Sequence, residues 1–305
     1  MPTPEPSPRH RHYGAFYGLD PLPEDDRPFV TVMGNCQAES LRLLLESSGA
    51  IRSVRVPPVF EIEADELPLL QRLLDRTDVL LTQPVRDGYR DLPLGSAELA
   101  ARVAPGARTV HFPTIRYAGL HPWQVVLRVP GEVDPPPVPY HDLRTLALAA
   151  GHEVHQGALS RKGIREVRDS SVAILAEREE RSDAVPVSDL LVPAGADAAH
   201  VINHPGNPVL VGLARRVAER LGLDAEIPEP TGTLLDEVHA PLLPEVLEAL
   251  GLAVDPVAHW VYRGAVLPDE QVREVQLDWL RERPHVVEFG LDRHRETARL
   301  LGIRP

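Results

Sequence analysis

Between positions 29 and 113, short runs rich in apolar residues alternate with segments in which apolar residues recur at helical spacing. The run FVTVM at 29–33 predicts a buried strand, and Leu41, Leu44 and Leu45 then share one face of a helix that ends at Gly49. The same alternation repeats along the chain. Further strands are predicted at 51–60, 78–85 and 107–113, and further helices at 64–76 and 96–104.

Strands that alternate with helices favour right-handed crossovers and a parallel sheet. We therefore predict an α/β fold class, with a small three-layer subdomain at 28–115. Residues 1–27 are rich in proline and charge, which predicts a flexible N-terminal arm. Residues 116–305 are predicted to be mainly helical after a proline-rich loop. The helices expected there are 141–150, 161–180, 207–222, 241–251, 269–282 and 291–301.

Composition narrows the classes of function. The net charge of −13 argues against a general nucleic-acid surface, and Lys162 is the only lysine, so a phosphate site must use arginines or backbone amides. A single cysteine excludes an intrachain disulfide and is typical of a reducing compartment. The first residues lack the apolar stretch of a secretory signal, and no run of eighteen apolar residues predicts a membrane span. We predict a cytoplasmic protein, and the oligomeric state stays open.

Polar clusters follow three of the predicted strands. GNCQ at 34–37 ends the first strand, Gln83 and Arg86 follow the third, and His111 ends the fourth. Ligands of open parallel sheets bind beyond the carboxyl ends of the strands. These clusters therefore predict a binding site at one edge of the sheet.

Cys36 occupies the predicted N-terminus of a helix, where unpaired N–H groups and the helix dipole favour a thiolate. Gly34 permits a tight turn, and Asn35 with Gln37 and the opening amides of the helix would form an oxyanion hole. The alternative is that Cys36 is a small buried hydrophobe in an ordinary Gly-Asn turn. The residues themselves leave both interpretations open.

A thiol nucleophile needs a base, and histidine is the usual one. His141 lies in the polar turn PYHD, and His204 lies in the polar turn NHPGNP, which also contains Asn203 and the expected helix cap Asn207. The alternative is that both histidines only shape their turns. Arg86 and Arg116 follow strand ends and are candidates for phosphate binding, and no metal site is predicted.

Several motifs in order resemble the WcbI-type polysaccharide-biosynthesis family. They are GNCQAESL, TQPVRDGY, HFPTIRYAGLHP, PYHD, ILAEREERSD, VSDLL and INHPGNPVLVGLA, within residues 29–224. The resemblance implies a mainly helical, cradle-like fold around a small α/β subdomain of SGNH- or flavodoxin-like type, with cysteine in place of the SGNH serine. It implies coenzyme A binding and acetyl transfer to a sugar hydroxyl. It makes Cys36 the nucleophile position with Gln37 as its neighbour, and it places Gln83, Arg86, His141 and His204 in the pocket.

The leading hypothesis is an acyl-CoA-dependent O-acyltransferase, with acetyl-CoA as co-substrate and a sugar or polyol acceptor in polysaccharide or natural-product biosynthesis. The thiolate of Cys36 would attack the thioester, and His204, ahead of His141, would deprotonate the acceptor. His111, Arg116, Asn203 and Asn207 are further candidates for substrate or coenzyme A binding. Two alternatives stay open: a cysteine-dependent thioesterase or esterase, and a non-catalytic coenzyme A-binding biosynthetic factor.

Overall fold

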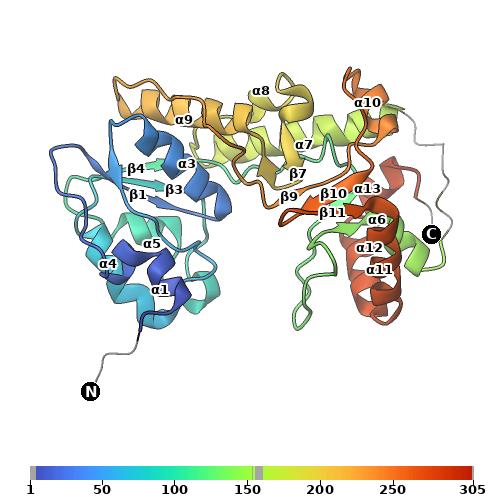
Figure 1. Cartoon of the computed structure of the whole chain (residues 1–305), viewed down its shortest axis with the longest axis horizontal. Coiled ribbons are helices and arrows are strands. Elements are labelled where there is room, and N and C mark those ends of the chain that lie inside the picture. Colours follow the sequence, from blue (N-terminus) through green and yellow to red (C-terminus); the bar gives the residue numbers. More distant parts are fainter. Residues whose placement is uncertain (1–4, 153, 155–160, 304–305) are drawn as a thin grey trace. The chain divides into compact units, whose positions relative to one another are not determined.

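A four-stranded parallel sheet organises the first part of the chain, in the order β2-β1-β3-β4 (Figure 1). In register, β1 pairs Phe29 with Arg52 of β2 and Met33 with Thr82 of β3. The next pair joins Thr82 to His111 of β4. The order reverses between β1 and β3, so the crevice in which open α/β sheets bind ligands is expected beyond the carboxyl ends of these two strands.

The computed structural model describes residues 5–152, 154 and 161–303. It divides into two units, and the chain contributes several segments to each. Unit 1 comprises Met1–Thr114, Ala176–Val187 and Asn207–Leu234, and unit 2 comprises Ile115–Leu175, Ser188–Gly206 and Leu235–Pro305. The sequence predicts a boundary at 115/116, close to the end of the first segment of unit 1 at Thr114. It does not predict that two later segments also belong to unit 1, because that depends on contacts between residues distant in sequence.

Unit 1 holds the sheet and the helices that cover it. Its strands are β1 Phe29–Met33, β2 Arg52–Ser53, β3 Val79–Thr82 and β4 Arg108–His111. Its helices are α1 Pro8–His12, α2 Gly14–Tyr17, α3 Cys36–Ser47, α4 Leu67–Leu74, α5 Ser96–Ala100 and α9 Asn207–Leu221, with 3-10 turns at Ala64–Glu66 and Tyr89–Asp91.

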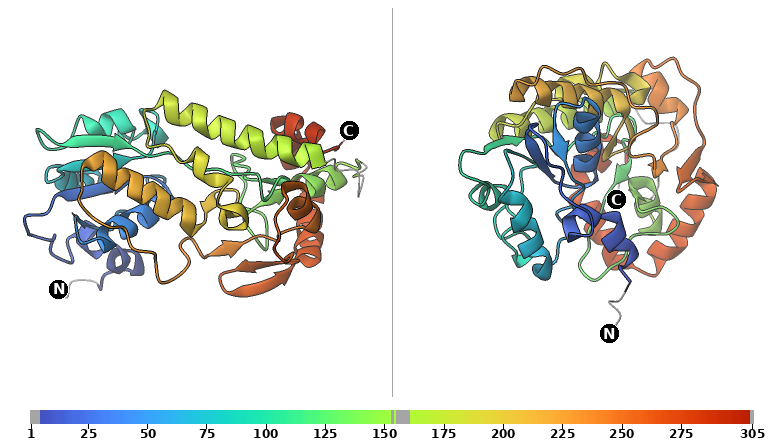
Figure 2. Two further views of the ribbon diagram at one scale, coloured as in Figure 1. Left: turned by 90° about the horizontal axis from the view of Figure 1, so that it is seen from above. Right: turned by 60° about the vertical axis from the view of Figure 1, so that its left-hand side comes forward.

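The sheet of unit 1 has helices on both faces (Figure 1). On one face, Phe29, Met33 and Leu80 pack with Leu73 of α4 and Leu99 of α5 in one apolar cluster. On the other face, α3 packs against α9, and the two lie side by side in both orientations (Figure 2). A parallel sheet covered on both faces explains why all five residues of β1 are buried.

Unit 2 combines helices with short strands. Its strands are β5 Gln124–Val125, β6 His141–Asp142, β7 Ala199–Val201, β8 His204–Pro205, β9 Val238–His239, β10 His259–Tyr262 and β11 Ala265–Pro268. Its helices are α6 Leu143–Ala149, α8 Ser188–Leu191, α10 Pro244–Leu250, α11 Asp269–Arg281, α12 Pro284–Arg293 and α13 Arg295–Leu300, with a 3-10 turn at Gly195–Asp197. The long helix α7 Arg161–Arg181 begins in unit 2 and ends in unit 1.

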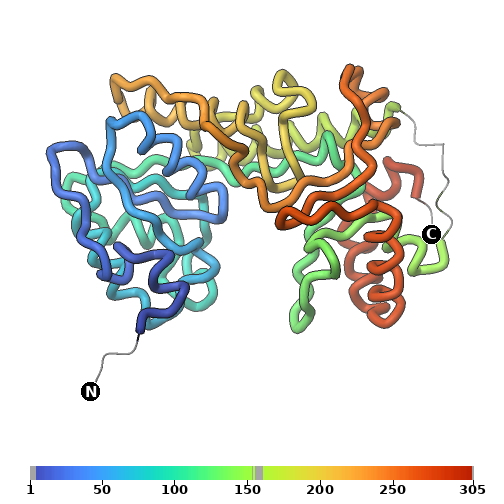
Figure 3. The backbone as a smooth tube through the Cα atoms, in the orientation of Figure 1, coloured from blue at the N-terminus to red at the C-terminus, as the bar shows by residue number. Residues whose placement is uncertain are grey.

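The core of unit 2 lies between α6, α11 and α12, where Leu146, Leu280 and Val287 share one apolar cluster. Gly290 lets α12 approach closely, because an added Cβ would lie 2.7 Å from a methyl group of Leu127. The chain between β5 and β6 forms the proline-rich loop that the sequence predicts, and its path can be followed in Figure 3. The sequence does not predict the short strands of unit 2, which lack alternating runs of sufficient length.

The N-terminal segment departs from the flexible arm that its composition predicts. Residues 8–17 form α1 and α2, and Phe16 is completely buried in the apolar cluster of unit 1. Arg9 adds an ion pair to Glu61 at 2.7 Å, and Tyr17 donates a hydrogen bond to Glu66. The aromatic residues of this segment outweigh its proline content, because burial of one large ring contributes on the order of 2–3 kcal/mol.

Candidate functional site

The turn after β1 is built to begin a helix. Asn35 has extended backbone angles and caps α3, and its Oδ1 accepts a hydrogen bond from the Gln37 N–H at 2.9 Å. The helix therefore starts at Cys36, as the sequence predicts. Cys36 is partly exposed, and it lies where the unpaired N–H groups of a helix create a positive end.

Gln83, directly after β3, fastens this turn from the neighbouring strand. Its Oε1 accepts the Asn35 N–H at 2.9 Å, and its Nε2 donates to Gln37 Oε1 at 3.3 Å and to the Pro113 carbonyl at 3.4 Å. The side chain is only 2% exposed. The polar atoms of Gln83 therefore hold the turn and link it to the carbonyl of Pro113.

Gly34 makes that arrangement possible. A Cβ at this position would lie 2.6 Å from Gln83 Oε1 and 2.9 Å from its Cδ, closer than non-bonded atoms approach. Its carbonyl also accepts the Val59 N–H at 2.8 Å. Glycine is needed here for space beside Gln83, which is a packing requirement that no motif in the sequence displays.

The amides around Cys36 differ from the predicted oxyanion hole in one respect. The backbone N–H groups of Asn35 and Gln37 are both used inside the turn. The side-chain Nδ2 of Asn35 is a different donor, and the bond from Gln37 to Oδ1 fixes its direction. An amide held in this way costs little reorganisation when an oxyanion forms, which is what catalysis by such donors requires.

Three other predicted residues of unit 1 have different surroundings. Arg86 is exposed beyond β3. His111 donates from Nδ1 to the Ser182 carbonyl at 2.9 Å, and so ties β4 to the segment after α7. Asn207 bonds through both ends of its amide, to the Gly232 carbonyl and the Leu234 N–H, each at 2.9 Å. His111 and Asn207 thus each hold other parts of unit 1 in place, and their part in ligand binding stays a prediction.

The remaining predicted residues belong to unit 2. His141 in β6 is 4% exposed and its ring lies 5.9 Å from that of Trp279. Neither ring nitrogen of His141 has a hydrogen-bond partner within residues 5–152, 154 and 161–303. Asn203 accepts a hydrogen bond from the Tyr140 hydroxyl at 2.9 Å, and Arg116 is exposed.

Burial controls the protonation of the histidines in unit 2. Loss of solvation lowers the pKa of His141 to about 4 and that of His121 to about 4, and it also lowers the pKa of His204. All three rings are therefore neutral near pH 7. A neutral imidazole can accept a proton, but one with so low a pKa is a weak base until a ligand changes its surroundings.

A group of histidines around β7 and β9 was not singled out by the sequence. The rings of His200 and His239 lie 4.2 Å apart, and His239 Nε2 contacts Asp236 Oδ1 at 2.6 Å. His204 belongs to the same neighbourhood, and the pKa of its imidazole is lowered mainly by burial and to a smaller extent by the nearby His239. The signal in the sequence was the placement of both histidines in short apolar runs, AHV and EVHA.

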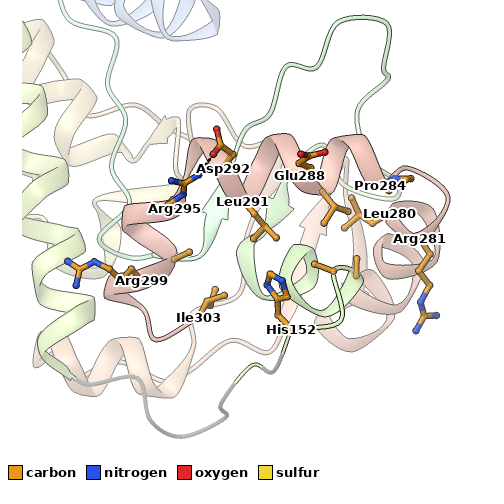
Figure 4. Close-up of a pocket in the computed structure, with 14 residues that line it drawn as sticks. His152, Leu280, Arg281, Pro284, Glu288, Leu291, Asp292, Arg295, Arg299 and Ile303 are labelled. Carbon is orange, nitrogen blue, oxygen red and sulfur yellow. Dashed lines mark hydrogen bonds and ion pairs between the residues drawn. The ribbon is translucent and has the colours of Figure 1, made fainter. Parts of the chain in front are cut away.

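Unit 2 also contains a cavity of about 730 Å³ between the end of α6 and helices α11 to α13 (Figure 4). Leu280 and Leu291 point into it from the helices, and His152 points into it from the chain after α6. None of the predicted site residues lines this cavity. Its volume suits a small molecule.

Within residues 5–152, 154 and 161–303, no group of three or more His, Cys, Asp or Glu side chains could hold a metal ion. Among the helices formed by those residues, none is both long enough and apolar enough to cross a membrane.

Comparison with known proteins places the chain in a family. Residues 29–226 match the family model described as "Polysaccharide biosynthesis enzyme WcbI". A solved structure of WcbI superposes with a TM-score of 0.77 at 21% identity, over 90% of this chain and 97% of that one. That structure is described as native protein without a disulfide bond between coenzyme A and one of its cysteines. No curated protein matches. Because the family model spans well over half of the sequence, the chain belongs to the WcbI family of polysaccharide biosynthesis enzymes.

Proposed function

We propose that this protein is an acyl-CoA-dependent O-acyltransferase that transfers an acyl group, acetyl in the simplest case, to a sugar or polyol hydroxyl. The observation that carries the proposal is the position of Cys36. It begins α3 beyond the carboxyl end of β1, beside the point where the strand order reverses, in a turn fastened by Gln83. The description of the similar structure, which names coenzyme A and a cysteine, supports coenzyme A as the ligand.

The same geometry supports a further proposal about the α/β part of the chain. The strand order and the helices on both faces suit an SGNH- or flavodoxin-like arrangement. In such an arrangement Cys36 would take the place of the SGNH serine, and the Asn35 amide would be an oxyanion donor.

The chemistry divides into two acyl transfers. In the first, the Cys36 thiolate attacks the thioester carbonyl, a new Cys36 thioester forms, and coenzyme A leaves as a thiolate. In the second, a base removes the proton of the acceptor hydroxyl, the oxygen attacks the Cys36 thioester, and the Cys36 thiolate is released. The proton on the base passes to the coenzyme A thiolate. Asn35 Nδ2 would donate to the oxyanion of both tetrahedral intermediates.

The base remains a prediction from the sequence, with His204 ahead of His141. Burial keeps both imidazoles neutral near pH 7, which is the form that accepts a proton. A base role for His204 predicts that His204→Gln lowers kcat by roughly 100-fold or more, whereas His141→Gln lowers it less. Equal losses in both variants would remove the preference for His204.

The decisive test is intact-mass analysis of the protein mixed with acetyl-CoA in the absence of an acceptor. The covalent scheme predicts a gain of one acetyl group, which Cys36→Ala abolishes while binding of coenzyme A persists. If no adduct forms and transfer to an acceptor still occurs, the acceptor attacks acetyl-CoA directly. Steady hydrolysis of acetyl-CoA without acceptor would instead favour a thioesterase. Full complementation by Cys36→Ala in cells would favour a non-catalytic binding factor.

A further inference from the structure

The edge strand β2 of unit 1 borders a cavity of about 500 Å³ lined by basic side chains. Arg52 and Ser53 of β2 and the next two residues, Val54 and Arg55, all line it, so the cavity runs along the outer edge of the sheet. Its basic lining residues are Arg11, His12, Arg27, Arg42, Arg52 and Arg55. Such a concentration stands out in a chain with a net charge of −13.

Three of these arginines are neutralised by ion pairs. Arg42 lies 2.7 Å from both Glu39 and Glu46. Arg27 lies 2.7 Å from Asp25, and Arg55 lies 3.3 Å from Glu39. These groups stiffen the walls of the cavity, but their charges are already balanced, so they contribute little attraction for a ligand.

Arg52 and Arg11 are held differently, by carbonyl groups. Arg52 Nε donates to the Arg27 carbonyl and its Nη1 donates to the Pro23 carbonyl, both at 2.7 Å. Arg11 Nη1 donates to the Pro6 carbonyl at 2.5 Å. Neither arginine forms an ion pair with any residue from 5 to 152, 154 or 161 to 303. Carbonyl partners orient a guanidinium without cancelling its charge, and the remaining N–H groups suit a phosphate or carboxylate oxygen.

We propose that this cavity binds a small molecule that carries a single phosphate group. Arg52 and Arg11 supply the fixed positive charge, and Tyr13, Leu22 and Val54 offer an apolar wall for the rest of the ligand. A volume of about 500 Å³ suits a metabolite better than a bare phosphate ion. Asp20 and Glu46 also line the cavity, and their charges disfavour a chain of several phosphates.

The proposal is independent of the acyltransferase function. The cavity uses residues from Arg11 to Pro23, which precede the region that matches the family model. The packing of α1 and α2 against the rest of unit 1 therefore completes a site that the family match includes only in part, since Arg52 and Val54 lie inside the matched region. The ligand would be either a second substrate or an effector of this protein, and in both cases it would carry the single phosphate group that the arginines bind.

Isothermal titration of the full-length protein at low salt tests the proposal, with glucose 6-phosphate and AMP as probes and glucose and adenosine as uncharged controls. We expect the phosphorylated probes to bind saturably and the controls not to bind. Arg52→Gln should weaken binding by roughly 10-fold or more, and Arg11→Gln by roughly 3- to 10-fold, since each removes a charge-assisted contact. Arg76→Gln, a surface arginine paired with Glu24 outside the lining, should stay within about 2-fold of wild type.

Two outcomes would overturn the proposal. One is the lack of saturable binding of either phosphorylated probe at millimolar concentration. The other is unchanged affinity in Arg11→Gln. Arg11 is exposed, so its loss leaves the fold intact and keeps the test valid even if Arg52→Gln unfolds. Raising the salt concentration should weaken binding in wild type more than in either arginine variant.

Discussion

Two buried polar sites, one in each unit, have opposite surroundings. In unit 1 the amides of Asn35, Gln37 and Gln83 bond to one another around Cys36. In unit 2, His141 is buried with no hydrogen bond to either ring nitrogen from the described part of the chain. A satisfied network rigidifies a site, whereas a desolvated histidine costs free energy that a ligand or a proton partner can recover. We infer that the turn of unit 1 is preorganised before any ligand binds. His141 of unit 2, in contrast, can gain a hydrogen bond only when a ligand or another proton partner reaches its ring.

The largest expected effect tests the cost of burying His141. Its pKa is about 4 in the folded protein and near 6.5 when exposed, so the unfolded state binds more protons between these values. Stability should therefore fall as pH drops from about 6.5 towards 4, by about 3 kcal/mol for this residue. His141→Leu should lose that part of the pH dependence, as measured by urea unfolding at several pH values.

The control for His141→Leu lies within the same experiment. Between pH 7.5 and 8.5 the imidazole is neutral in both states, so the stability difference between variant and wild type should stay constant there. An identical pH profile of the two proteins down to pH 4 would show that His141 is not desolvated as the structure indicates.

The next effect concerns the space beside Gln83. Gly34→Ala places a methyl group 2.6 Å from a buried, hydrogen-bonded atom and should lower the free energy of unfolding by about 2–3 kcal/mol. Acyl transfer should fall with it, because the turn that carries Cys36 must shift. Gly232→Ala is the matched control: a Cβ there meets nothing within 4 Å, and the change in stability should stay below about 1 kcal/mol.

Loss of the Gln83 amide should have a smaller effect on stability but a clear kinetic signature. Gln83→Leu removes the acceptor of the Asn35 N–H and should lower the free energy of unfolding by about 1–2 kcal/mol. If Gln83 only positions the turn, kcat falls while KM for acetyl-CoA changes little. A rise in KM with unchanged kcat would assign Gln83 to ligand binding instead. Gln71→Leu, on the partly exposed surface of α4, should leave both constants unchanged.

The smallest expected effect distinguishes a structural role of Asn207 from a role in ligand binding. Asn207→Ala removes two hydrogen bonds to the backbone at Gly232 and Leu234, and should cost about 1 kcal/mol, because the site is partly exposed and water can replace the bonds. Affinity for coenzyme A, measured by titration, should not change. A loss of affinity without a loss of stability would restore Asn207 to the binding site.

Much of unit 1 could be predicted from the sequence because its signals are local. The run at 29–33 and the stripe of Leu41, Leu44 and Leu45 predict β1 and α3, and the start of the helix at Cys36 follows from the cap Asn35. The strand predicted at 51–60 shrinks to Arg52–Ser53, because only its first residues find a neighbour to pair with. In unit 2 the C-terminal stretch 291–301 divides into α12 and α13 around His294, a break that the apolar pattern does not show.

The sequence by itself determined the alternation of strands and helices, the position of Cys36 at the start of α3 and the motifs that mark the family. Each depends on residues close together in the chain, where spacing and capping act directly. Only the tertiary structure decided that Gln83 fastens the turn, that His111 and Asn207 have structural partners, and that the N-terminal segment is packed. Those outcomes depend on burial and on hydrogen bonds between residues distant in sequence, which no local pattern encodes.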